Sequence, residues 1–308
     1  SQPLGEQKIL GGEKSLSLAL KRGWCDGIIR IGGVPTTRLW RDLEKLFANI
    51  PVINFSHLPF VGLSRESVKV FSVEDLLNSE VKIESTNREW RALQTEAQEE
   101  LRRLKEQFSQ SEVAMLGQLA ERLPKSARIY LGNSLPIREW DLNSAEVSQQ
   151  WWVEGNRGAN GIDGTIATAY GVAAASPGPV VLLTGDVTLA HDAGSLLTAT
   201  RIGVPLTIVL IDNGGGGIFD FLPVAGETDQ FETHVATPPG VDVAGLAQAY
   251  GLHLLPVEDL AGLRAAIEYR LSSDGTQVIH VRTDRSENVA VHRGLWDAVG
   301  AALAEPTA

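Results

Sequence analysis

The sequence predicts an α/β protein whose larger part is a doubly wound parallel sheet. Two short apolar runs, residues 180–184 and 206–211, have the pattern of strands buried on both faces. Between them, apolar residues at positions 193–200 recur at helical spacing, which predicts a strand–helix–strand unit. Strand and helix patterns alternate through the rest of the chain, and this alternation favours parallel strands joined by crossover helices.

The first 85 residues are predicted to form part of a separate α/β domain. Helices are expected over residues 15–21, 37–47 and 73–77, and strands over residues 27–31, 52–55 and 68–71. Thr36 or Thr37 can cap the second helix, which places Arg38 in its first turn, where a solvated arginine is the simplest interpretation. Residues 78–88 are polar and indicate a linker to a second domain, residues 86–308.

The second domain is predicted to begin with a charged helical stretch, residues 89–123. Its charges indicate a solvated face, and residues 109–112 can cap a second helix that ends before Pro124. Residues 227–239 are polar and irregular, which predicts a mobile loop or a short helix. Strands are expected over residues 127–131, 252–255 and 276–282, and helices over residues 165–175, 241–250, 257–271 and 289–303.

Composition excludes several classes of function. The net charge is −11, and basic residues do not cluster, so nucleic acid and anionic membranes are poor partners. The chain shows no apolar run of about 20 residues and no signal-peptide pattern at its start, so the cytoplasm is the default compartment. Cys25 is the only cysteine and is expected in the core. Met115, the only methionine, lies inside a helix pattern, which favours a clipped or engineered part of a longer polypeptide.

Polar residues follow both strands of the central unit. Asp186 comes after the first strand and Asn213 after the second, and parallel strands end at the same sheet edge. A carboxylate, an amide and backbone carbonyls are hard oxygen ligands for Mg²⁺, whose octahedron phosphate oxygens can complete. Residues 214–217 are all glycine, so a diphosphate can approach the backbone. The alternative is an ordinary Gly-Asp turn and a flexible glycine loop.

Two further loops are expected at the same edge. Residues 132–134 form a turn after a strand, with Arg138 one helical turn beyond. Residues 156–164 are rich in glycine and contain Arg157, which is typical of a loop that presses against a ligand. A tight loop in which Asp163 caps the following helix is the competing interpretation.

These motifs together resemble one enzyme family. Gly185-Asp186 followed by Asn213 resembles the thiamine-diphosphate motif, although Val187 replaces its third glycine and Asp212 its first asparagine. Residues 132–138, 156–164 and 216–223 resemble, in the same order, 2-succinyl-5-enolpyruvyl-6-hydroxy-3-cyclohexene-1-carboxylate (SEPHCHC) synthase of menaquinone and phylloquinone biosynthesis. The resemblance covers nearly the whole chain. It implies a thiamine-diphosphate-binding fold over residues 86–308, preceded by part of a Rossmann-like central domain.

The resemblance also implies an activity and a set of site residues. The family uses Mg²⁺, with Mn²⁺ as an alternative, and thiamine diphosphate to decarboxylate 2-oxoglutarate and add the resulting carbanion to isochorismate. Its metal ligands match Asp186, Asn213 and the carbonyl of Gly215. Its cofactor contacts match Ser134, Gly161, Ile162, Gly185, Asp186, Val187, Asn213, Gly215, Gly216 and Ile218. Its substrate contacts match Arg38, where the family has lysine, and Arg138, Arg157, Ile218, Phe219 and Leu222.

No catalytic residue is expected within the chain itself. The family carries its catalytic glutamate on an N-terminal domain that is donated across a dimer interface, so this chain alone is expected to bind cofactor weakly and not to turn over. The complete enzyme is expected to be a homodimer or homotetramer. Two other hypotheses stay open: an acetohydroxyacid synthase or 2-oxoacid decarboxylase, and a non-catalytic nucleotide-binding α/β fragment. The chain has no intact GxGxxG fingerprint to support the latter.

Overall fold

The chain folds into two compact units. The computed structural model describes residues 12–35, 37–58, 60–65, 68–78, 88–144, 151–157, 161–270 and 274–302. Within these residues, the larger unit contains residues 101–294, and the smaller contains residues 12–100 and 295–302. The division falls inside helix α4 (Arg88–Gln107). The domain boundary predicted at residue 85 lies outside the described residues.

The smaller unit contains a parallel sheet of three strands in the order β1-β2-β3. One face of the sheet packs against a core that includes Leu20, Trp40 and Leu43. Its strands and helices are β1 (Ile28–Ile31), β2 (Val52–Phe55), β3 (Lys69–Phe71), α1 (Gly12–Lys21), α2 (Arg38–Asp42) and α3 (Val73–Leu77).

The helix predicted over residues 37–47 is shorter than expected. It ends at Asp42 and continues as tight turns, because the amides of Glu44 and Lys45 bond to carbonyls three residues back instead of four. Leu43 and Phe47 still reach the core, so the apolar spacing was interpreted correctly but the hydrogen-bond pattern was not.

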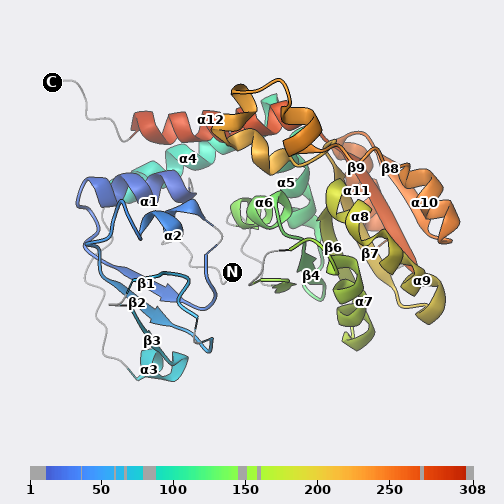
Figure 1. Ribbon diagram of the computed structural model, residues 1–308, viewed down its shortest axis with the longest axis horizontal. Helices are drawn as coiled ribbons and strands as arrows, with labels where there is room; N and C mark the ends of the chain where they lie inside the picture. Colours follow the sequence, from blue (N-terminus) through green and yellow to red (C-terminus); the bar gives the residue numbers. More distant parts are fainter. Residues whose placement is uncertain are drawn as a thin grey trace. The chain divides into compact units, whose positions relative to one another are not determined.

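The larger unit is built on a six-stranded sheet in the order β5-β4-β6-β7-β9-β8, in which every pairing is parallel (Figure 1). From β4 the chain moves to one side to form β5 and then crosses to the other side of β4 to form β6. This reversal opens a crevice at the carboxyl ends of β4 and β6. The strands are β4 (Arg128–Leu131), β5 (Trp152–Gly155), β6 (Val180–Gly185), β7 (Leu206–Asp212), β8 (His253–Val257) and β9 (Thr276–Arg282).

Helices cover both faces of this sheet, which confirms the doubly wound prediction. Ile129 and Val181 belong to one core cluster, and their neighbours Tyr130 and Leu182 to the other, because alternate strand residues point to opposite faces. The first face is covered by α5 (Glu112–Arg122), α6 (Leu135–Ser144) and α11 (Leu260–Arg270). The second is covered by α7 (Thr165–Ala175), α8 (Asp186–Asp192), η2 (Ala193–Leu196) and α10 (Val243–Ala249).

The remaining elements are mostly short. Residues 227–239, predicted as a loop or short helix, contain one turn of π-helix, and α12 begins four residues before its predicted start at 289. These elements are α9 (Leu197–Ile202), η3 (Gly217–Phe221), η4 (Pro223–Gly226), η5 (Glu232–Ala236) and α12 (Arg285–Ala302). Among the described helices, none has both the length and the apolarity needed to cross a membrane.

Candidate functional site

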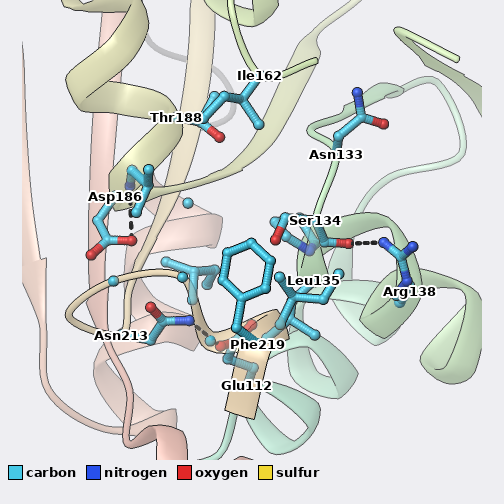
Figure 2. A pocket seen from close by; sticks show the side chains of 18 of the residues that line it. Glu112, Asn133, Ser134, Leu135, Arg138, Ile162, Asp186, Thr188, Asn213 and Phe219 are labelled. Carbon is cyan, nitrogen blue, oxygen red and sulfur yellow. Dashed lines mark hydrogen bonds between the residues drawn. The ribbon is translucent and has the colours of Figure 1, made fainter. Parts of the chain in front are cut away.

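A cavity of about 290 Å³ lies in the larger unit, beside the carboxyl ends of β4, β6 and β7. Loops that follow four strands line it, as expected for a ligand site at a topological switch point. In the view of Figure 2, Asp186 and Asn213 lie on one side, Ser134 and Arg138 on the other, and the ring of Phe219 between them. The predicted site residues that line the cavity are Ser134, Arg138, Arg157, Ile162, Gly185, Asp186, Val187, Asn213, Gly215, Gly216, Ile218 and Phe219.

Three predicted site residues are not among those that line the cavity. Leu222 lies just beyond η3 and is 44% exposed, and Gly161 acts through its backbone carbonyl, which accepts a hydrogen bond from Asn133. Arg38 belongs to the smaller unit and is the first residue of α2. Its exposed side chain lies 3.9 Å from the carboxylate of Asp42, the last residue of that helix. The ligand contacts of these three residues, like those of the residues that line the cavity, stay predictions.

Asp186 is a buried carboxylate with one uncommitted oxygen. It begins α8, is 5% exposed, and its Oδ1 accepts a hydrogen bond from the Val187 amide over 2.9 Å. Oδ2 has no partner in normal hydrogen-bond geometry among the described residues. Burial raises the pKa of Asp186 to about 6, although the nearby amides of Val187 and Gly215 oppose the rise. A bound cation would compensate for such a buried charge.

Asn213 presents a second uncommitted oxygen from the neighbouring strand. It follows β7, which pairs with β6 so that Gly185 is opposite Ile211. Its Nδ2 donates to Glu112 Oε1 over 2.5 Å, whereas its Oδ1 has no partner among the described residues. The predicted convergence of Asp186 and Asn213 on one sheet edge is therefore confirmed.

The oxygen set fits a divalent cation held jointly with a ligand. No group of three or more His, Cys, Asp or Glu side chains within the described residues is arranged to hold a metal alone. One carboxylate and one amide oxygen suit Mg²⁺ when a bound diphosphate supplies further oxygens, since Mg²⁺ commonly binds through few protein ligands.

The glycine turn is fixed where it borders the cavity. Gly215 has a φ of 136°, and a Cβ there would lie 2.7 Å from the Ala236 carbonyl oxygen. A Cβ on Gly217 would lie 2.8 Å from the Asn213 Nδ2. The Gly216 amide donates to Ala236 at the end of η5 over 2.6 Å. The turn is therefore anchored to η5, and a side chain at Gly215 or Gly217 would clash with the protein atoms packed against the turn.

Two arginines that line the cavity are held in place by hydrogen bonds to neighbouring residues. Arg138 Nη1 donates to the carbonyl of Ser134, a residue with a φ of 73°, which is uncommon for a residue other than glycine and recurs at functional sites. Arg157 Nη1 donates to Asn133 Oδ1 over 2.6 Å, and burial lowers the pKa of Arg157. Asn133 Nδ2 also donates to the carbonyls of Asn156 and Gly161, so it fixes the glycine-rich loop.

The sequence interpretation missed several residues that line the cavity, notably Glu112, Asn133 and Thr188. Asn133 sits inside a predicted turn, so its position was a usable signal. Glu112 was expected only in a helix cap. Its side chain is 1% exposed, and burial first, followed by nearby Glu139, raises its pKa to about 8.

Asp212, which departs from the thiamine-diphosphate motif, has a separate partner. Its Oδ2 lies 2.8 Å from the Nε2 of His280 on the adjacent strand β9. The hydrogen bond from His280 holds the pKa of Asp212 below its usual range. Asp212 is thus tied into the sheet, while the next residue, Asn213, faces the cavity.

Comparison with known proteins shows that the chain is similar to thiamine-diphosphate enzymes. Residues 140–281 match the family described as "Thiamine pyrophosphate enzyme, C-terminal TPP binding domain". The chain is 43% identical over 195 residues to a SEPHCHC synthase from Chloroflexus aurantiacus, covering 63% of this chain and 33% of the relative. It is 34% identical over 290 residues to the synthase from Geobacillus thermodenitrificans, covering 91% of this chain and 49% of the relative.

The chain therefore spans about a third to a half of the length of the curated relatives it matches. Among solved structures, it is similar to the benzoylformate decarboxylase from Polynucleobacter necessarius, with 23% identity and a TM-score of 0.47 over 56% of this chain and 33% of that chain.

Proposed function

Because the chain belongs to the family of SEPHCHC synthases, which are thiamine-diphosphate-dependent enzymes, we propose that it supplies the metal- and diphosphate-binding part of such an enzyme. The proposed reaction decarboxylates 2-oxoglutarate and adds the product to isochorismate. The observation that carries the metal site is the pair of unpartnered oxygens, Asp186 Oδ2 and Asn213 Oδ1, at neighbouring strand ends. From the resemblance alone, we also propose a cytoplasmic homodimer or homotetramer that acts in menaquinone or phylloquinone biosynthesis.

The chain's own residues would hold the cofactor by its charged end. Asp186, Asn213 and the carbonyl of Gly215 would bind Mg²⁺ or Mn²⁺ and, through it, the diphosphate. Ile162, which lines the cavity, would give the rest of the cofactor an apolar surface to rest on. When bound, thiamine diphosphate supplies the electron sink for cleaving the carbon–carbon bond beside a keto group.

The arginines give the cavity its affinity for carboxylates. Both proposed substrates carry several carboxylate groups, and a planar guanidinium binds a carboxylate with two parallel hydrogen bonds. Arg138 and Arg157 line the cavity, and hydrogen bonds to Ser134 and Asn133 hold their orientations before a ligand arrives. This preorganisation reduces the entropy lost on binding.

The apolar residues of η3 would shield the reacting groups from water. Ile218 and Phe219 line the cavity on the side of the glycine turn. Their position supports a role in excluding water from the place where the two substrates would react.

To test the metal site, the binding of thiamine diphosphate to the purified chain is measured by calorimetry, with and without Mg²⁺. We expect Asp186→Asn to weaken the Mg²⁺-dependent binding at least tenfold, since it replaces a metal-binding carboxylate with a neutral amide. Asp274→Asn is the matched control, because Asp274 is exposed and precedes the amino end of β9. Binding that is independent of Mg²⁺, or equal in the Asp186→Asn variant, would refute the site.

The substrates are tested with the complete enzyme. A panel of 2-oxoacids is offered together with isochorismate, and 2-oxoglutarate should be consumed in preference to the others. A preference for pyruvate would instead support an acetohydroxyacid synthase or a simple decarboxylase.

A further inference from the structure

Glu112 is a buried carboxylate beside the proposed metal site. It lies in the first turn of α5, directly after Ser111, whose side chain caps the helix by accepting a hydrogen bond from Ala114. The next residue, Val113, donates its amide to Asn288 Oδ1 over 3.2 Å. The helix end is therefore fixed on both sides of Glu112, and the Glu112 side chain is held at the cavity wall.

The hydrogen bond from Asn213 to Glu112 fixes which end of the amide faces the cavity. Glu112 Oε1 accepts the hydrogen bond from the Asn213 NH₂ group over 2.5 Å, either as a carboxylate oxygen or as the carbonyl oxygen of a protonated carboxyl group. Flipping the amide would bring two acceptor oxygens into contact. Figure 2 shows this bond running from Asn213 toward Glu112, on the side of Asn213 away from Asp186. As a consequence, Asn213 Oδ1 is left without a partner among the described residues.

We propose that Glu112 is a positioning residue for the metal site: it orients the amide of Asn213 so that Oδ1 is presented to the cation bound by Asp186. This inference rests on the proposed metal–diphosphate function. It assigns a role to a residue that the thiamine-diphosphate motif does not include. Groups that orient metal ligands typically change metal affinity about 10- to 100-fold when they are removed.

A purely structural role explains Glu112 less well. Its side chain is 1% exposed, its Oε2 has no partner among the described residues, and Glu139 is a second buried carboxylate nearby. Burying a carboxyl group in this way costs stability, and an apolar side chain of similar size would fill the space better. The carboxylate is therefore expected to serve Asn213 and not the packing of α5.

The first test replaces Glu112 with methionine, which has similar length but accepts no strong hydrogen bond. The dissociation constant of Mn²⁺ in the presence of thiamine diphosphate is measured by the electron paramagnetic resonance signal of free Mn²⁺. We expect Glu112→Met to weaken Mn²⁺ binding about 10- to 100-fold, while the Tm of the unliganded chain stays equal or rises. Glu121→Met, on the exposed side of the same helix, is the control and should change neither value.

The second test exchanges the two groups. Asn213→Asp alone places two carboxylates against each other and removes the donor, so metal binding should fall sharply. Adding Glu112→Gln restores the hydrogen bond in the reverse direction, because the amide of residue 112 now donates to one carboxylate oxygen of residue 213. The second oxygen of residue 213 then faces the cavity. We expect the double variant to bind Mn²⁺ about tenfold more tightly than Asn213→Asp alone, the non-additivity expected of residues in direct contact.

Each result has a defined meaning. Unchanged Mn²⁺ affinity in Glu112→Met, or a double variant no tighter than Asn213→Asp, would overturn the role of Glu112. If the unsubstituted chain shows no Mn²⁺ binding with thiamine diphosphate, or if Asp186→Asn binds as tightly as the unsubstituted chain, the proposed function itself fails and the inference fails with it. Weak binding in Asp186→Asn together with unaffected binding in Glu112→Met refutes only the inference.

Discussion

Buried ionisable side chains lie behind the cavity as well as in it. Glu139 on α6 is fully buried, and its Oε1 accepts hydrogen bonds from Asn288 over 3.0 Å and from His292 over 2.8 Å. Burial disfavours a charged His292, but the Glu139 carboxylate outweighs this effect and raises the pKa of His292. The His292 ring also meets the Phe221 ring edge-on at 5.1 Å. Because Phe221 belongs to η3, this pair supports the wall that carries Phe219.

The raised pKa of His292 predicts a pH-dependent stability. A histidine with a raised folded pKa contributes stability that is complete below its unfolded pKa of about 6.5 and is lost as the pH rises through the higher folded value. The Tm difference between the unsubstituted chain and His292→Gln should therefore be largest below pH 6.5 and narrow above it. Melting curves from pH 5.5 to 9 measure this, with the exposed His253→Gln as control. A difference independent of pH would contradict the prediction.

Residue spacing predicted the two side-chain ligands of the proposed metal site but could not predict the residue proposed to position one of them. The positions of Asp186 and Asn213 followed from the rule that parallel strands end at one edge. Glu112 could not be found in this way, because its bond to Asn213 joins residues 101 positions apart on different elements. Nothing in the local sequence around Ser111 distinguishes a capping segment from a segment that also supports a ligand.

At the scale of elements, one arginine joins three segments around the cavity. Arg285, the first residue of α12, donates two hydrogen bonds of 2.8 Å from Nη2 to Glu232 on η5. Its Nη1 lies 3.8 Å from Asp220 on η3. Since η5 anchors the glycine turn and η3 carries Phe219, Arg285 holds together the two short helices on that side of the site.

Removing this arginine should loosen both short helices. We expect Arg285→Gln to increase amide hydrogen exchange in residues 217–237 at least several-fold, because η3 and η5 are short and depend on contacts outside themselves. Exchange in β6 and β7 should stay unchanged. Arg122→Gln is the matched control. It removes a surface ion pair, 3.1 Å between Arg122 Nη1 and Glu268 Oε1, and both of these residues lie outside residues 217–237. Equal exchange in residues 217–237 of both variants would show that Arg285 does not hold them.

Elements with a strong periodic signal were predicted, and those without one were not. The buried strands β6 and β7 are largely apolar runs, β9 has the apolar residues Val278, Ile279 and Val281, and all three strands were predicted nearly to the residue. No bounds were predicted for strand β5, because Trp152–Gly155 is a short edge strand with one charged residue and no apolar run. The π-helical turn η5 depends on its contact with the glycine turn, so its sequence alone predicted only a loop or short helix.

At the scale of the whole molecule, the order of strands determines where the site forms. The reversal at β4 and β6 brings loops from four strands to one edge, and the described cavity lies there. Gly132 makes this junction tight, since a Cβ on it would lie 3.0 Å from the Leu183 carbonyl oxygen. The alternation of strands and helices predicted a parallel sheet, but it could not give the strand order, which depends on the direction of each crossover.

The two carboxyl groups that line the described cavity, Asp186 and Glu112, both have roles in the proposed metal site. Asp186 would bind the cation and Glu112 would orient Asn213, so neither is assigned the contact with the pyrimidine ring of the cofactor, which the family resemblance implies is made by a glutamate on an N-terminal domain. We therefore expect the 308-residue chain alone to bind Mg²⁺ and thiamine diphosphate weakly and to release no CO₂ from 2-oxoglutarate. A full-length synthase from a relative, assayed in parallel, is the positive control. Decarboxylation by the 308-residue chain at a normal enzyme rate, abolished by Asp186→Asn, would show that this chain already contains a complete catalytic site.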